Sequence, residues 1–137
     1  MDKERIDGFR SAFAPGETLF WQVPAAARER MVFYRENFSR FFAAKITAVF
    51  AVSDHYALEF MRFLQGQGIR VPEDVQIIGF DNIEFSQYCE PSLSTMQQPT
   101  FDMGAKAVEL LTGIIEKRDP VQPERLIPKL LMRKTTR

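Results

Sequence analysis

The sequence is poor in the residues from which metal centres and nucleophilic sites are built. Its 137 residues include a single cysteine, Cys89, and a single histidine, His55. One cysteine excludes an intrachain disulfide and fits a reducing compartment, and the two residues together cannot supply a zinc site of standard spacing. A hydrolytic triad would need His55, which has no evident nucleophile beside it. We expect no metal, no cofactor and no enzymatic activity, with Cys89 structural and His55 solvated.

The sequence also has no excess of charge of either sign and no long apolar run. Eighteen basic residues balance eighteen acidic ones, so no global field favours nucleic acid or an anionic membrane. No apolar run approaches the ~20 residues that span a bilayer, and the first residues, MDKERIDGFR, are unlike a signal peptide. These absences predict a cytoplasmic protein with no membrane partner. We interpret the basic residues near the C-terminus as a solvated tail: Lys129, Arg133, Lys134 and Arg137.

Short apolar stretches alternate with helical patterns along the chain. Hydrophobic spacing predicts helices over 3–13, 25–44, 55–65 and 100–117. The first should be ended by Pro15-Gly16 and the last by Asp119-Pro120. Strands are expected at 18–23, 47–52, 75–80 and 93–96, and within 125–134, where Pro128 indicates an edge or a bulge. This order predicts an α/β fold: a three-layer arrangement with a mostly parallel sheet flanked by helices.

Polar side chains follow two of the predicted strands directly. TAVFAV is followed by Ser53-Asp54, and VQIIGF by Asp81-Asn82. Ligands of open parallel sheets bind beyond the carboxyl ends of the strands, where a carboxylate can accept hydrogen bonds from a small polar molecule. An acid in such a position can equally form a turn or cap a helix, and Asp54 suits a helix cap better. Gly79, inside a strand, predicts the close approach of another backbone.

The segment 47–99 resembles the C-terminal core of the lactose-repressor/galactose-repressor family of bacterial transcription regulators. The family pattern runs T-A-V-F-A-x-N-D, A-L, G-x-x-V-P-x-D-V, G-F/Y-D-[DN] and P-x-L-T-T-x-x-Q-P, and the chain carries nearly all of it in order. ERIDGF at 4–9 and the ending LLMRKTTR also match, whereas 14–44 match poorly. The resemblance implies the C-terminal subdomain of a periplasmic-binding-protein-like fold.

The resemblance also implies which residues contact the effector. Asp81 would be its acidic ligand, Ser53 stands where the family usually has an asparagine, and Arg5 matches an arginine that reaches into the cleft. Because Ser53 offers one hydroxyl in place of an amide, the effector chemistry is expected to differ or binding to be lost. Trp21 would stack on a sugar face or belong to the core. Gln98 and Thr100 would line the cleft at the crossover.

Two further implications concern assembly. Residues 1–98 and 125–137 would form the C-terminal subdomain, while helix 100–117 would pack on an N-terminal subdomain that this partial domain does not contain. Leaving that apolar stripe in water costs roughly 1.5–3 kcal/mol for each large side chain. We therefore expect the helix to pack on its own subdomain in a position foreign to the family, or on another copy. The candidate residues for a homodimer interface are Phe60, Phe63, Phe85 and Tyr88, although Phe60 could equally face the core.

The expected function is the effector-sensing and dimerisation part of a transcription regulator that controls DNA binding allosterically. The effector would be a small polar molecule, a sugar by default, and DNA would be reached only through a headpiece absent from this chain. The alternative is a stand-alone solute-binding or interaction module. An enzyme on a similar fold is disfavoured, because the chain shows no phosphate-binding glycine loop and no nucleophile elbow.

Overall fold

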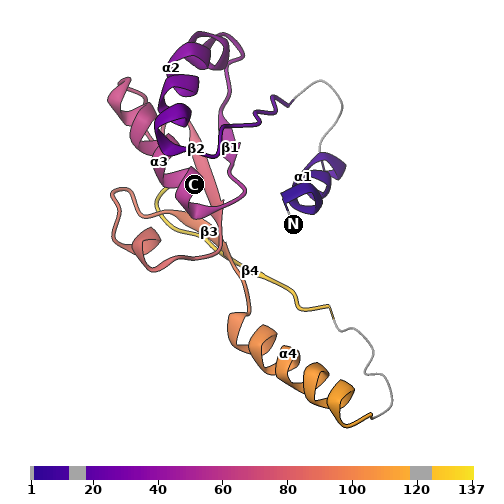
Figure 1. Cartoon of the computed structure of the whole chain (residues 1–137). Coiled ribbons are helices and arrows are strands. Elements are labelled where there is room, and N and C mark those ends of the chain that lie inside the picture. The colour runs from indigo at the N-terminus through magenta and orange to yellow at the C-terminus, as the bar shows by residue number, and fades with distance from the viewer. Residues whose placement is uncertain (1, 13–17, 118–124) are drawn as a thin grey trace.

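The computed structural model describes residues 2–12, 18–117 and 125–137 (Figure 1). Residue 13, where the first predicted helix ends, and both predicted helix breaks, Pro15-Gly16 and Asp119-Pro120, lie outside these ranges.

A four-stranded sheet with the order β1-β2-β3-β4 forms the centre of the molecule. Its strands are β1 (Ala48–Phe50), β2 (Gln76–Phe80), β3 (Ser94–Gln97) and β4 (Lys129–Leu131). The first three run parallel and β4 pairs antiparallel with β3. The prediction of an α/β fold with a mostly parallel sheet is therefore confirmed. Between β2 and β3, one 3-10 turn, η1 (Glu84–Gln87), interrupts the irregular chain.

Two helices cover one face of this sheet. Helix α3 (Asp54–Gly66) connects β1 to β2 and packs against β2, and α2 (Ala27–Ala43) lies outside it. Alternation along β2 explains the contact, since Ile77 and Gly79 are buried towards α3 while their neighbours in the strand are only half-buried. Arg30 of α2 joins the two helices through a bidentate pair with Glu59, at 2.8 Å for both oxygens.

Aromatic side chains fill the space between α2, α3 and the segment before α2. Neighbouring rings in this cluster lie 5.0–6.3 Å apart. The members of the cluster are Trp21, Phe33, Tyr34, Phe38, Phe41, Phe60 and Phe63. The strand predicted at 18–23 is wrong: this segment pairs with no strand, and Trp21 and Val23 pack half-buried against the core while Phe20 is 39% exposed.

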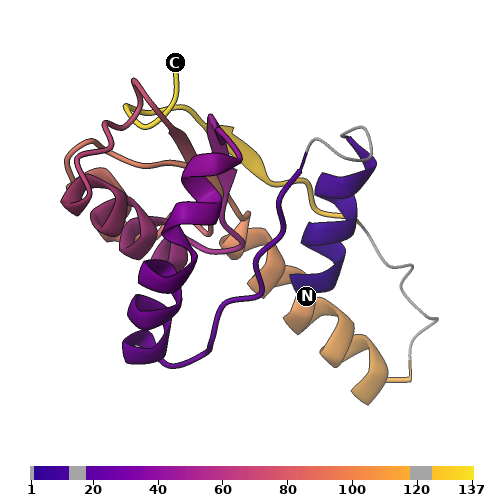
Figure 2. The same ribbon diagram turned by 90° about the horizontal axis from the view of Figure 1, so that it is seen from above.

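Helix α1 (Asp2–Ser11) lies on the other side of the sheet, away from α2 and α3 (Figures 1 and 2). The ring of Phe9 stacks on Phe50 of β1 with the centroids 5.6 Å apart. The guanidinium of Arg5 lies 3.9 Å from the ring centroid of Phe80 in β2. One amphipathic turn thus covers the ends of β1 and β2 and carries Arg5 to the edge of the sheet.

Helix α4 (Thr100–Ile115) leaves the sheet after β3 and extends away from the rest of the protein (Figure 1). Phe101 is 86% exposed and Ile114 is 75% exposed. The expectation that this helix packs on its own subdomain is therefore wrong, because its apolar side chains find no surface there; packing on another copy stays a prediction. Within the described ranges, no helix combines the length and the apolar character needed to cross a membrane.

Candidate effector-binding site

Ser53 and Asp81 lie beyond the tips of two adjacent parallel strands. Phe50 of β1 is paired with Ile78 of β2, and the amide of Ala51 donates to the carbonyl of Ile78 at 2.9 Å. Both residues follow this paired position by the same number of residues, which places them at the same edge of the sheet. Both are half-buried, so neither is sealed inside the protein. The two residues thus share one edge of the sheet, as the sequence predicts; that they bind one ligand there stays a prediction.

Arg5 of α1 contacts both strand tips. Its Nη1 donates to the carbonyl of Val52 at 2.6 Å, and its Nη2 lies 3.6 Å from Asp81 Oδ1. The Arg5 side chain is only 12% exposed and that of Asp81 is 28% exposed. Stacking on Phe80 holds the guanidinium plane in place, so the positive charge faces the Asp81 carboxylate at this edge.

Gln98 completes the group from the connection between β3 and α4. Its side-chain Nε2 donates to Asp81 Oδ1 at 2.6 Å. Thr100 lies at the first turn of α4, where its amide donates to the carbonyl of Gln98 and its side chain is exposed. Within the described part of the chain, Asp81 Oδ2 carries no hydrogen bond, so this oxygen is free to accept one from a polar ligand.

A hollow of about 630 Å³ adjoins this group. Arg5, Phe80 and Gln98 contribute to its wall, as do Met103 of α4 and Arg125. Its volume lies within the range of small-molecule sites. Ser53, Asp81 and Thr100 are not part of this wall. Asp81 lies behind it and contacts two of the wall residues, Arg5 and Gln98.

Asp54 neither caps α3 nor faces a ligand. Ser53 is the N-cap residue, without a capping hydrogen bond from its side chain, and Asp54 is 0% exposed beneath the strand tips. Its Oδ2 accepts the amide of Ile83 at 2.9 Å and its Oδ1 accepts the hydroxyl of Thr95 at 2.5 Å. Gly79 leaves room for this carboxylate, since a Cβ there would meet Asp54 Oδ1 and lie 3.2 Å from Asp54 Cα. The close approach predicted at Gly79 is confirmed.

The structure moves three aromatic residues from predicted binding roles into the core. Trp21 packs edge-on against Phe33 and Phe60 at 5.5 and 5.8 Å, so it belongs to the aromatic cluster and not to a sugar-stacking platform. Phe60 and Phe63 are buried under α2, with exposures of 6% and 5%, which leaves no side-chain surface for a partner copy. Phe85 and Tyr88, in contrast, are 62% and 71% exposed.

Arg133 is a residue next to this edge that the sequence interpretation misses. The sequence predicts a solvated tail here, yet Arg133 is half-buried and its guanidinium donates to Asn82 Oδ1 at 2.6 Å. Its acceptors are far away along the chain, so no local pattern could have indicated them. Lys129, Lys134 and Arg137 are exposed as expected.

Cys89 and His55 have the simple roles that the sequence predicts. The thiol of Cys89 donates to the carbonyls of Ser86 and Pro91 at 3.3 Å, and burial raises its pKa, which favours the unreactive protonated form. His55 is exposed in the first turn of α3. No cluster of potential metal ligands occurs in the ranges that the structure describes.

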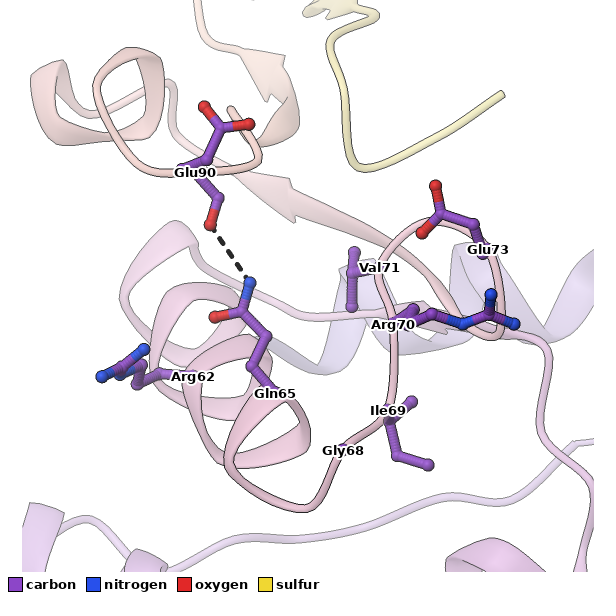
Figure 3. A pocket seen from close by; sticks show the side chains of 8 residues that line it. All are labelled: Arg62, Gln65, Gly68, Ile69, Arg70, Val71, Glu73 and Glu90. Carbon is purple, nitrogen blue, oxygen red and sulfur yellow. Dashed lines mark hydrogen bonds between the residues drawn. The ribbon is translucent and has the colours of Figure 1, made fainter.

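A second hollow, of about 490 Å³, lies at the C-terminal end of α3 (Figure 3). Its wall includes Arg62, Gln65, Arg70, Glu73 and Glu90, and Gln65 Nε2 donates to the Glu90 carbonyl at 3.1 Å. None of the residues predicted to bind an effector lines it. Its arginines do not converge on a common point, since Arg62 and Arg70 point to different sides (Figure 3).

Residues 3–136 match the model of one protein family, the periplasmic binding protein-like domain. The chain belongs to this family. The structures that resemble this periplasmic binding protein-like chain are regulators. It superposes with a TM-score of 0.82 on a LacI family transcriptional regulator from Enterococcus faecium with bound ribose, at 28% identity over 98% of this chain and 51% of that one. A CelR–cellobiose complex gives a TM-score of 0.76 at 30% identity, over 96% of this chain and 40% of the regulator.

Two curated relatives of this chain are named as repressors. The transcriptional repressor CytR of Escherichia coli K12 is 41% identical over 92 residues, which cover 66% of this chain and 27% of CytR. PurR of Vibrio campbellii is 33% identical over 140 residues, which cover 98% of this chain and 42% of PurR. The chain thus spans less than half the length of these relatives. The resemblance to the lactose-repressor/galactose-repressor family is confirmed, and the relatives are repressors, not enzymes.

Proposed function

We propose that this chain is the effector-sensing part of a transcription regulator and that it binds a small polar molecule, of the sugar class, at the carboxyl edge of its sheet. The observation that carries the proposal is the convergence of Arg5, Asp81 and Gln98 from three different elements beside a hollow of about 630 Å³. The similar structures that hold ribose and cellobiose support the sugar class.

The chemistry of the group suits a ligand rich in hydroxyls. The free oxygen of Asp81 accepts a hydrogen bond from a hydroxyl group, and hydrogen bonds to a charged acceptor are roughly twice as strong as neutral ones. Arg5 donates to oxygen acceptors on the same molecule, while Phe80 and Met103 supply apolar surface for the faces of its ring. Ser53 adds one hydroxyl at the neighbouring strand tip, in reach of a ligand that spans both tips.

The link from the site to α4 supports allosteric control. Gln98 holds Oδ1 of Asp81 with its side chain and lies directly before α4, so a ligand bound to the other oxygen of Asp81 acts on the connection to that helix. A ligand shifts a conformational equilibrium only through different affinities for the two states. In this proposal the two states differ in whether a ligand is bound to Asp81 beside Gln98, and the regulator works as a cytoplasmic homodimer with Phe85 and Tyr88 at its interface.

Thermal-shift measurements test the proposal. The chain is heated with ribose, cellobiose, lactose or a set of nucleobases, and a ligand at 100 times its Kd stabilises by about 2.7 kcal/mol, which raises Tm by several degrees. Asp81→Ala should abolish the shift. Asp74→Ala is the matched control, because Asp74 lies in the turn before β2 and pairs with exposed Arg70. A shift that survives Asp81→Ala, or is lost in Asp74→Ala alone, contradicts the site.

The exposed face of α4 favours a second candidate, an interaction module. Its large apolar side chains cover several turns and contact no other element extensively: Phe101, Met103, Val108, Leu110, Leu111, Ile114 and Ile115. Contiguous exposed apolar surface of this kind marks interaction sites. Heterodimer formation with a full-length regulator, measured by co-purification in the absence of any effector response, would favour this candidate over effector sensing.

A further inference from the structure

The backbone turns sharply directly after the strand that carries Asp81. Asp81 has φ 118° and Asn82 has φ 55°, and both values lie in a region that residues with a side chain rarely adopt. Such conformations persist only where the surroundings hold them, and they cluster at ligand sites. The carboxylate orientation at the effector edge therefore depends on whatever holds this turn.

One set of contacts holds the turn from inside. The hydroxyl of Thr95 accepts the amide of Asn82 at 3.3 Å and donates to Asp54 at 2.5 Å, while Asp54 also accepts the amide of Ile83. Thr95 and Asp54 are both 0% exposed. Asp81 itself donates its amide to the carbonyl of Met96 at 2.9 Å. The backbone amides of the turn are thus all occupied.

Arg133 holds the turn from outside, through a side chain. Its Nη2 donates to Asn82 Oδ1 at 2.6 Å, and its Nη1 donates to the hydroxyl of Ser86 and the carbonyl of Leu93, each at 2.8 Å. These acceptors are neutral, so the half-buried charge is held by hydrogen bonds and not by an ion pair. A planar guanidinium can satisfy such divergent acceptors together, which a compact ammonium cannot do.

We propose that Arg133, acting through the side chain of Asn82, is a positioning residue that keeps Asp81 oriented towards Arg5, Gln98 and the effector. The inference rests on the proposed function. Without the anchor on its side chain, residue 82 is no longer held at this φ, and the turn rotates the Asp81 carboxylate away from Gln98. Arg133 touches no ligand in this account; it fixes the geometry of the residue that does.

The test reads the Asp81–Gln98 hydrogen bond in the intact, ligand-free chain. Solvent exchange of the Gln98 side-chain amide is measured by nuclear magnetic resonance in Asn82→Gly, Asn82→Asp and Arg133→Lys. Glycine tolerates the positive φ but removes the acceptor, so exchange should accelerate about tenfold, the worth of one hydrogen bond. Asn82→Asp keeps the acceptor and should retain slow exchange. Arg133→Lys should behave like Asn82→Gly.

Lys134→Met is the control, because Lys134 is exposed beside Arg133 and should leave the Gln98 exchange unchanged. If exchange stays slow in Asn82→Gly, the inference is overturned, even where Arg133→Lys fails to fold. Equal acceleration in Asn82→Gly and Asn82→Asp would overturn it as well, since the acceptor would then be irrelevant.

A failure of the proposed function can be distinguished from a failure of this inference. If the wild-type chain shows no thermal shift with ribose, cellobiose or lactose, the sugar-binding proposal fails, while the exchange measurement still decides whether Arg133 positions Asp81. If the wild type binds ribose, Asn82→Gly should raise the Kd for ribose about tenfold and Asn82→Asp should not. An unchanged Kd in Asn82→Gly would contradict the positioning role.

Discussion

Substituting Gly79 by alanine should destabilise the protein strongly, because the strand and the buried carboxylate of Asp54 share one space. The new Cβ would meet Asp54 Oδ1 and lie 3.1 Å from Cδ2 of Leu93. Asp54 and Leu93 are both 0% exposed, so neither can move into solvent. Overpacking costs about 1–3 kcal/mol, and displacing Asp54 from one of its hydrogen bonds costs about 1–3 kcal/mol more. The expected loss is roughly 2–6 kcal/mol.

Urea unfolding followed by circular dichroism measures this loss, and thermal unfolding should show Tm lower by roughly 7–20 °C for a chain of this size. Gly66→Ala in α3 is the matched control, because nothing lies within 4 Å of a Cβ there. It should leave stability unchanged or raise it by up to about 1 kcal/mol. A Gly79→Ala variant as stable as the wild type would refute the packing of Asp54 against β2.

Three other predictions concern the helices. Burial beside Glu59 raises the pKa of Tyr34. Its contribution to the free energy of unfolding is therefore complete below a pH of about 10, the pKa of tyrosine in the unfolded chain, and is lost as the pH rises above that value. Tyr34→Phe should therefore weaken the fall in unfolding free energy above about pH 10; an equal slope in the wild type and the variant would contradict the burial of Tyr34. Arg30→Met should cost about 1–2 kcal/mol in urea unfolding by leaving Glu59 unpaired, and no change would show that the pair contributes nothing. Ile114→Lys should reduce concentration-dependent self-association in sedimentation velocity; a wild type that stays monomeric at all concentrations would refute packing of α4 on another copy.

The centre of the fold could be predicted because its signals are local. The runs 47–52 and 75–80 are apolar and β-branched and surround a helical stripe, which suffices for a parallel β-α-β unit. The side chains at the tips of two parallel strands must then meet at one edge, as Ser53 and Asp81 do. The segment 18–23 has equally strong strand character, but strand character does not show whether a neighbouring strand or a helix will cover it. Here Trp21 is covered by helices.

The parts of the site that could not be predicted depend on contacts between distant residues. Asp54 looks like a helix cap in sequence, and only the missing side chain of Gly79 in the next strand lets it turn inward. Arg133 looks like part of a basic tail, and its acceptors on Asn82, Ser86 and Leu93 are brought to it by the sheet. Phe60 and Phe63 have the spacing of either a core or an interface, and the aromatic cluster of α2 decides between them.

The most direct test of the binding edge is a ligand titration followed by nuclear magnetic resonance on the labelled chain. With ribose or cellobiose, the account predicts that the largest shifts appear at Ser53, Asp81 and Gln98, and that they vanish in Asp81→Ala. Shifts confined to Gln65 and Glu90, at the hollow of Figure 3, would place the ligand at the other end of α3 and contradict the account.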